Sequence, residues 1–256
     1  MGRVVPAVAR AVDILDLFLT GAETLSMPEM TAALGLPRAT VHDLVSTLVD
    51  RALLAHAPGQ PHRYRLGHRL CQLGNAYAER LDLPREGTHV AAEVAARCAE
   101  TVHVAVLDGA DVVYVAKVDS TQSVRLVSAV GRRLPAHCTA VGKMLLAGLP
   151  PDDFAARYPT DTLPGMTSAS ITDTRALTRE INEIRACGLA FDHCESNPSV
   201  ACVAAGVHDR THTMVAAMSI SVPTVRWSDD IAAALALVVT EGARRLSTLL
   251  GDNRHS

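Results

Sequence analysis

The chain has 256 residues, 48% hydrophobic and 20% charged, which is the composition of an ordinary soluble globular protein with one large or two modest domains. Its formal net charge of −3 excludes a basic field over the whole molecule, so affinity for nucleic acid has to come from a local patch. The apolar runs are too short to cross a bilayer, and the N-terminal residues lack a signal-peptide pattern, so we expect a cytoplasmic protein that does not enter a membrane.

The first predicted element is an amphipathic helix from Val5 to Leu19. Its apolar residues recur at helical spacing, and they are Val8, Val12, Leu15 and Leu19. We expect this side of the helix to pack behind the two helices that follow, as the first helix of a three-helix unit.

Residues 25–66 have the pattern of a winged helix-turn-helix. Ser26 stands three residues before Glu29, the spacing of a capping box that starts a helix. Gly35 breaks the chain, and Pro37 opens a second helix. The predicted inward residues are Met30, Ala33 and Leu34 in the first helix, and Val41, Leu44, Val45 and Leu48 in the second. The outward polar residues of the second helix, which we expect to contact DNA, are Arg38, Thr40, His42 and Ser46.

A predicted β-hairpin follows the second helix. The apolar pair 53–54 leads into a turn cluster at 58–61, and the alternating run 63–66 places Arg63 and Arg65 on one face. A hairpin directly after a recognition helix forms a wing, so we expect both arginines to hold phosphates or the minor groove. Any pair of packed helices would give the same apolar spacing, but the wing, the turn residues and the arginines favour the DNA-binding interpretation.

An apolar seam follows the wing at alternating spacings of four and three residues, formed by Leu66, Leu70, Leu73 and Tyr77. Such a seam pairs two chains or lies on its own domain, and the sequence leaves both interpretations open. Pro84 ends this segment and marks the predicted domain boundary. The resulting division has a winged helix-turn-helix over 1–66, a linker helix over 67–84 and a further domain over 85–252.

Beyond Pro84, predicted strands alternate with predicted helices. We expect helices over 88–98, 140–147, 174–187 and 230–250, with N-caps at Thr139 and at Thr172 or Asp173, and a C-terminal stop at Gly188. We expect strands over 102–107, 112–118, 124–130, 189–192, 201–207 and 214–222, the first two joined by a hairpin turn at 108–109. Hairpin turns between the strands predict an α+β domain with an antiparallel sheet.

Short motifs along nearly the whole chain resemble the IclR-type transcriptional regulators. They are residues 10–15 (RAVDIL), 34–42 (LGLPRATVH), 64–67 (YRLG), 131–140 (GRRLPAHCTA) with the Gly-Lys pair at 142–143, and 202–205 (CVAA). The resemblance implies an N-terminal winged helix, a linker helix and a C-terminal GAF-like domain that binds a small effector. It also implies a dimer or tetramer that acts on palindromic operator DNA. The chain departs from the family pattern at Asp43, Ser199 and Gly206.

The family's effector pocket, carried over residue by residue, falls on Leu134, Ala140, Val141, Asp192, Cys202, Ser219 and Ser221. The residues themselves agree in part. Ala140 and Val141 lie in the first turn of a predicted helix, where free N–H groups and the helix dipole favour a carboxylate. Ser219 and Ser221 place two hydroxyls on one side of a strand, although such a pair alone is typical of a solvated sheet face.

We therefore expect a small organic acid as the effector, with apolar walls, an amide nest and hydroxyls around it. A hydroxy or oxo acid is the first choice, because Asp192 would accept a hydrogen bond from a ligand hydroxyl. No cofactor is expected.

The cysteines and histidines raise two sharper hypotheses. The pairs 137–138 and 193–194, with Cys202 and Asp192, offer zinc-ligand types, or a Cys–His hydrolase in which Asp192 orients the base. Their spacings match no known ligand pattern, and G-x-S-x-G, GxGxxG and Walker motifs are absent, so we predict no catalytic and no metal site. The alternative function is a Cys-dependent enzyme on the GAF-like domain, with the winged helix as an appended interaction module.

Overall fold

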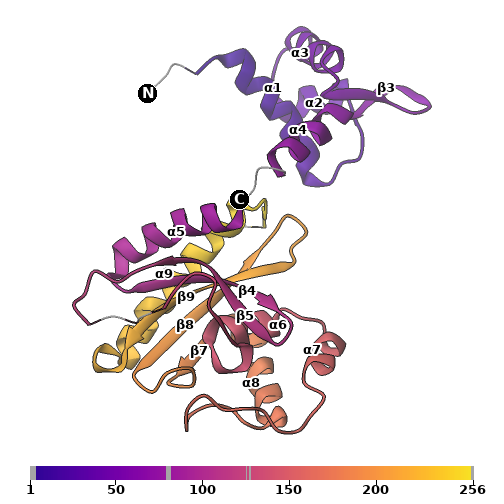
Figure 1. Ribbon diagram of the computed structural model, residues 1–256. Coiled ribbons are helices and arrows are strands. Elements are labelled where there is room, and N and C mark those ends of the chain that lie inside the picture. Colours follow the sequence, from indigo (N-terminus) through magenta and orange to yellow (C-terminus); the bar gives the residue numbers. More distant parts are fainter. Residues whose placement is uncertain (1–3, 79–81, 125, 127, 255–256) are drawn as a thin grey trace. The chain divides into compact units, whose positions relative to one another are not determined.

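The computed structural model describes residues 4–78, 82–124, 126 and 128–254 (Figure 1). The chain divides into two compact units, residues 1–81 and residues 82–256. None of the helices in the described ranges is long and apolar enough to span a membrane.

The first unit is a winged helix-turn-helix, as the sequence predicts. Its helices are α1 (Pro6–Asp16, extended by the 3₁₀ turn Leu17–Thr20), α2 (Met27–Leu34), α3 (Arg38–Asp50) and α4 (His68–Ala78). The short strand β1 (Leu25–Ser26) and the wing strands β2 (Leu54–Ala57) and β3 (Gln60–Leu66) form an antiparallel sheet in the order β1-β3-β2. The capping box of Ser26 and Glu29 is present at the start of α2, and Gly35 ends that helix with a φ of 63°.

The predicted inward face of the first helix is correct at Leu15, which packs against the core of the unit, and wrong at its other three residues. Val8 and Val12 are 62% and 49% exposed, and Leu19 is 71% exposed. The most buried side chains of this segment are Ile14 of α1 and Phe18 of the 3₁₀ turn, which join Met30, Val41 and Val45 in the core of the unit. Ala33 is also exposed, because Met30 and Leu34 already fill the inner side of α2.

Helix α4 leaves part of its predicted apolar seam uncovered. Leu66 and Leu73 are 43% and 55% exposed, and Leu70 is half-buried. The side chain of Tyr77, the fourth member of the predicted seam, lies outside the described residues.

The second unit is an α+β domain built on one antiparallel sheet, which confirms the predicted fold class. The strands are β4 (Thr101–Asp108), β5 (Asp111–Val118), β6 (Arg133–Pro135), β7 (Ala190–His193), β8 (Val200–His208) and β9 (Met214–Pro223), in the order β6-β5-β4-β9-β8-β7. The helices are α5 (Leu83–Cys98), α6 (Ala140–Ala147), α7 (Pro151–Arg157), α8 (Thr174–Cys187) and α9 (Asp229–Leu249), with 3₁₀ turns at Ala136–Cys138 and Thr224–Arg226.

The two faces of this sheet carry different helices. Helices α5 and α9 pack on one face, where Gly87 of α5 approaches Val104 and Gly242 of α9 approaches Met218. Helix α6 packs on the other face against β8, β9, β4 and β7, with α8 behind it (Figure 1). Because side chains alternate along a strand, the sequence of each strand divides between these two layers.

Three local expectations in the second unit need correction. Helix α5 begins at Leu83, five residues before the predicted Thr88, because the Asp82 side chain caps it by accepting from Arg85 N. Pro84 therefore stands in the first turn of α5 and does not end the preceding segment. The described residues of 124–130 form no strand, and Val124 and Val130 in this segment are 57% and 59% exposed. The neighbour of β5 in the sheet is β6, and the sequence pattern predicted neither β6 nor α7.

A buried ion cluster joins α6, α8 and the turn after β7. The Lys143 side chain of α6 is fully buried, and its ammonium pairs with Glu195 at 2.6 Å and with Glu180 of α8. Burial raises the pKa of Glu195, and the positive charge of Lys143 lowers it by a smaller amount. Because an ion taken out of water costs several kcal/mol unless it is paired, these three side chains hold their elements together.

We expect Lys143→Met to destabilise the second unit by about 3–5 kcal/mol, because it leaves two carboxylates without their buried cation. Urea denaturation followed by the fluorescence of Trp227, the single tryptophan of the chain, measures this loss. The double variant Lys143→Met/Glu195→Leu should recover part of the loss by removing the buried charge. Arg179→Met, at an exposed position of α8, serves as the control. A wild-type denaturation midpoint for Lys143→Met would contradict the role given to the cluster.

Candidate nucleic-acid interface and ligand-binding site

The N-terminal half of α3 presents the polar surface that the sequence predicts for DNA contact. Arg38, His42 and Ser46 are exposed, and Thr40 is half-buried. The opposite side of α3 enters the core through Val41 and Val45. His42 lies 3.5 Å from the carboxylate of Asp43, so one acidic side chain stands on this otherwise neutral or basic surface.

The two arginines of the wing have different environments. Arg65 is exposed, and within the described residues no carboxylate lies within ion-pairing distance of Arg65 or of Arg38. The Arg63 guanidinium, in contrast, donates to the side chain and the carbonyl of Thr24 at 2.9 Å and pairs with Glu29 at 3.0 Å. Arg63 therefore ties the wing to the capped start of α2, and its phosphate contact stays a prediction.

The predicted ligand residues of the second unit come together on one side of the sheet. Asp192 of β7 lies opposite Cys202 of β8, which lies opposite Ser221 of β9, and Ser219 follows on the same side. Leu134, Ala140, Val141 and Cys202 belong to one core cluster beneath α6. All seven residues are buried, with at most 8% exposure, so this face is closed to solvent.

The first turn of α6 forms the amide end of this site. The Thr139 side chain caps the helix by accepting from Gly142 N at 3.0 Å. The amides of Ala140 and Val141 occupy the first two helical positions, which have no acceptor within the helix. Gly142 is required here, because a Cβ atom would collide with the backbone of Ala136 in the preceding 3₁₀ turn.

A chain of hydrogen bonds crosses the sheet below α6. The Cys202 thiol donates to Ser221 Oγ at 3.2 Å, Ser221 Oγ lies 3.3 Å from His103 Nδ1, and His103 Nε2 lies 2.7 Å from Ser128 Oγ. The imidazole of His103 also stacks on Tyr114 with ring centroids 4.4 Å apart. Sequence reasoning missed His103 and Tyr114, although a histidine inside the apolar run of β4 was a signal for them.

The titratable groups in and beside this row of hydrogen bonds are uncharged at physiological pH. Burial, and then the charge of Lys117, lower the pKa of His103 to about 3. Burial, and then the charge of Asp192, raise the pKa of the Cys202 thiol well above its usual value. Burial likewise raises the pKa of Tyr114. This row of hydrogen bonds therefore offers uncharged donors and acceptors.

Asp192 is already bonded within its own turn. Its carboxylate accepts from Glu195 N at 2.6 Å and from Ser196 Oγ at 2.5 Å. Cys194, which lies in this turn between Asp192 and Glu195, adopts a φ of 65°. Burial raises the pKa of Asp192. These bonds fix the turn that places Glu195 beside Lys143. A ligand hydroxyl would therefore have to share the Asp192 carboxylate with the backbone and Ser196 of this turn.

The histidines and cysteines of the zinc and hydrolase hypotheses make other contacts in the structure. His137 Nε2 donates to the carbonyl of Pro164 at 2.9 Å, and the Cys138 thiol donates to the same carbonyl at 3.9 Å. His193 is exposed and stacks on Phe191. Over the ranges that the structure describes, no group of three or more His, Cys, Asp or Glu side chains is placed to hold a metal ion.

Comparison with known proteins adds two family matches that together span most of the chain. A family model described as the IclR helix-turn-helix domain matches residues 7–58, and one described as the bacterial transcriptional regulator IclR C-terminal domain matches residues 75–248. The first match covers α1 to β2, and the second extends from α4 into α9.

Individual proteins match over nearly the full length. The chain is 31% identical over 248 residues to the HTH-type transcriptional regulator XynR of Escherichia coli K12, covering 97% of this chain and 98% of XynR. It is 34% identical over 223 residues to the regulator Rv1719 of Mycobacterium tuberculosis, covering 87% and 84% of the two chains. The crystal structure of the Agobacterium tumefaciens repressor BlcR matches with a TM-score of 0.90 and 29% identity, covering 98% of this chain and 100% of BlcR.

The buried His103 predicts an acid-sensitive second unit. Its pKa falls from 6.5 to about 3 on folding, so below pH 6.5 the unfolded chain binds a proton that the folded chain does not. His103 therefore lowers the free energy of unfolding as the pH falls, by about 1.4 kcal/mol per pH unit between its two pKa values. We expect His103→Gln to show a shallower dependence of the free energy of unfolding on pH from about pH 6.5 to about pH 4. Identical slopes for the two proteins, measured by Trp227 fluorescence in urea, would refute this assignment.

Proposed function

This chain belongs to the IclR family of transcriptional regulators, with a helix-turn-helix DNA-binding domain and a C-terminal ligand-binding domain, and on that premise we propose how it is controlled. A small organic acid, with a hydroxy or oxo acid as the first choice, binds the face of the sheet below α6. The observation that carries this proposal is that the seven residues carried over from the family's effector pocket, which come from distant parts of the chain, lie together and are buried beside one face of the sheet. The amides of Ala140 and Val141 meet the carboxylate, and the Ser219 and Ser221 hydroxyls donate to it.

Because this face is closed to solvent, ligand binding there can be coupled to a change of conformation and so to DNA binding. Ser221 is bonded to Cys202 and His103, and the Ala140–Val141 turn is buried in the core cluster. A ligand that enters has to open this packing, so it binds one conformation more tightly than the other. That difference in affinity, typically about 1–3 kcal/mol of coupling, is what the DNA-binding unit can respond to.

We infer that the protein regulates without catalysis. The Cys202 and Cys138 thiols both have raised pKa values from burial, whereas a nucleophilic cysteine needs a lowered one. Asp192 is bonded to its own turn and orients no histidine in the described structure. A Cys-dependent enzyme, the alternative function, therefore has less support.

The partners we propose are a palindromic operator and further copies of this chain. A single winged helix in a chain of net charge −3 gives few phosphate contacts, and a dimer or tetramer multiplies them. Exposed apolar side chains of the first unit are available for such an assembly, namely Val8, Val12 and Leu19 in and after α1, Leu66 at the end of β3 and Leu73 of α4. A regulator that binds the chromosome acts in the cytoplasm, which is where we place this protein.

We expect the exposed cations of the first unit to have separable effects on DNA binding. Arg38→Ala should cost about 1–3 kcal/mol on a cognate site and relax sequence preference, because the start of α3 reaches base edges. Arg65→Ala should weaken binding to all sequences alike and reduce the salt dependence by about one phosphate contact. The measurement is titration of duplexes that the wild-type protein selects from a random library, at several salt concentrations.

Arg179→Ala, an exposed arginine of the second unit, is the control for loss of charge. Unchanged affinity and sequence preference in an Arg38→Ala/Thr40→Ala double variant would overturn the assignment of α3 as the recognition helix.

We expect Ser221→Ala to abolish the response to the effector acid while leaving binding to the selected DNA intact, because it removes a hydroxyl at the proposed carboxylate end. Ala140→Leu should do the same by filling the space below α6. A thermal-shift screen of small hydroxy and oxo acids identifies the acid, and DNA titration with and without it measures the response. Ser168→Ala, an exposed serine, is the control. If both variants respond like the wild type, the effector site lies elsewhere.

A further inference from the structure

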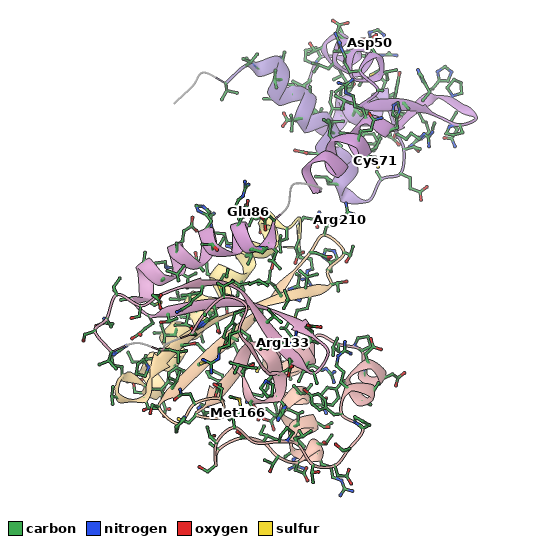
Figure 2. All side chains as sticks on the ribbon, viewed as in Figure 1. Asp50, Cys71, Glu86, Arg133, Met166 and Arg210 are labelled. Carbon is green, nitrogen blue, oxygen red and sulfur yellow. The ribbon has the colours of Figure 1, made fainter. Side chains whose placement is uncertain are left out.

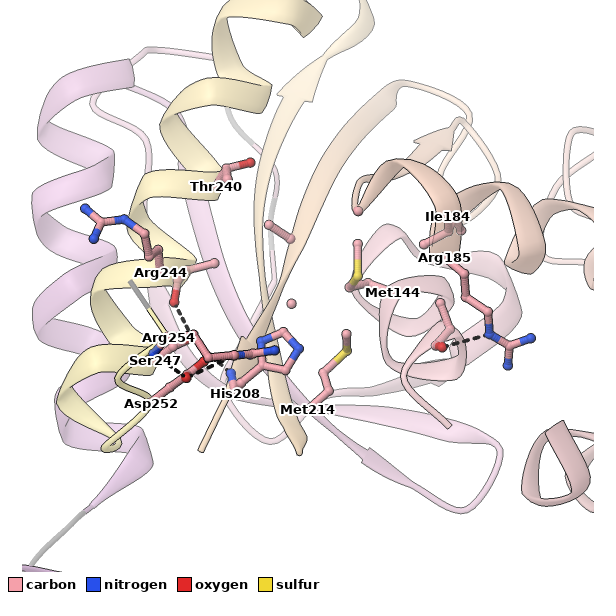
Figure 3. Close-up of a pocket in the computed structure, with 15 residues that line it drawn as sticks. Met144, Ile184, Arg185, His208, Met214, Thr240, Arg244, Ser247, Asp252 and Arg254 are labelled. Atoms are coloured by element: carbon pink, nitrogen blue, oxygen red, sulfur yellow. Dashed lines mark hydrogen bonds and ion pairs between the residues drawn. The ribbon is translucent and has the colours of Figure 1, made fainter. Parts of the chain in front are cut away.

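The second unit holds a separate cavity of about 510 Å³, and none of the seven proposed effector residues lines it. Strand β7 pairs with β8 only as far as Ala204, so residues 205–208 of β8 continue beyond the end of their neighbour. Figure 3 shows the cavity around this segment, with α9 on one side and α6 and α8 on the other. Its volume lies within the usual range for small-molecule sites, about 300–1,000 Å³.

The floor of the cavity is apolar and adaptable. Met144 of α6 and Met214 of β9 face it from two layers, together with Ile184 of α8 (Figure 3). Gly206 makes room for one of them, because a Cβ atom there would lie 2.5 Å from the Met214 methyl carbon. Methionine side chains adjust their shape to apolar ligands of different outline.

The rim of the cavity carries positive charge that the protein does not neutralise. Among the residues that the structure describes, the acceptors of Arg185 are all neutral, namely the carbonyls of Ala147 and Leu149 at 3.0 Å and the Asn182 side chain at 3.1 Å. Arg244 is exposed, and no carboxylate in the described part of the chain lies within ion-pairing distance of it. The positive charge of Arg185 and Arg244 is therefore available to a ligand.

The one carboxylate of the lining is already occupied. Asp252 is buried, pairs with Arg254 at 2.6 Å and lies 3.0 Å from His212. The remaining titratable group of the lining, His208, is neutral, because burial and then the charge of Arg254 lower its pKa. The cavity thus combines an apolar floor with an unpaired cationic rim.

We propose that this cavity is a second ligand site, which takes an amphipathic monocarboxylate with an alkyl or aryl body. The body lies on Met144 and Met214, and the carboxylate meets Arg244 at the rim. This site does not depend on the effector pocket proposed above, because the two share no lining residue. Helix α6 connects them, with Ala140 at its start and Met144 and Ala147 in its second half.

Calorimetric titration of the full-length protein with octanoate tests the proposal, using 1-octanol and octylamine as neutral and cationic probes of the same chain length. Arg244→Gln removes the rim charge, and Thr240→Phe places a ring over the cavity from an exposed position of α9. The matched controls are Arg179→Gln for charge and Leu237→Phe for an added ring at another exposed position of α9.

We expect octanoate to bind once per chain and each cavity variant to weaken it by about tenfold or more, a loss of about 1.4 kcal/mol, while both controls bind like the wild type. Ser221→Ala should also bind octanoate normally, so a failure of the effector pocket would not affect this result. The proposal is overturned if 1-octanol or octylamine binds as tightly, or if Arg244→Gln and Thr240→Phe leave binding unchanged. It is also overturned if light scattering shows an oligomer that Thr240→Phe dissociates, because a second copy would then cover the cavity.

Discussion

The buried ammonium of Lys143 is the interaction on which the second unit depends. It joins α6 to α8 through Glu180 and to the turn after β7 through Glu195. The same turn is closed by Asp192, whose carboxylate accepts from Glu195 N. Because a buried charge without its partners is strongly destabilising, this cluster disfavours any arrangement of helix, turn and strand that separates the three side chains. The proposed effector face therefore takes its geometry from a cluster that lies beside it.

Helix α6 is the element through which the parts of this unit are related. All eight of its residues are buried, so it has no solvent face and each of its sides is fixed by a neighbour. Thr139 and Gly142 set its start against the preceding 3₁₀ turn, while Met144 and Ala147 reach the separate cavity in its second half. Because close-packed protein interiors are hardly compressible and transmit strain, a displacement of this enclosed helix would also displace its neighbours.

In the function proposed above, the polar groups beneath α6 recognise a ligand and carry out no covalent chemistry. Cys202, Ser221 and His103 form a connected row, but burial keeps the thiol protonated and the imidazole uncharged. Such a row presents directional donors and acceptors in a low-dielectric interior, where an unmatched partner is costly. In the proposed effector site, such a row would distinguish ligands by their hydrogen-bonding pattern.

The sequence by itself determined the features that depend on neighbouring residues: the capping box at Ser26, the turn at Gly109, the start of a helix at Thr174 and the side of the strand on which Ser219 and Ser221 lie. Only the tertiary structure decided which face of α1 is buried and that Pro84 lies in the first turn of a helix. It also decided that Arg63 ties the wing to the start of α2. It also placed Ser221 beside His103 across 118 residues, and Lys143 beside Glu180 and Glu195 across 37 and 52. Spacing along the chain gives the side on which a residue projects, but burial and partners follow from which distant strand or helix lies opposite, and that depends on packing of the whole unit.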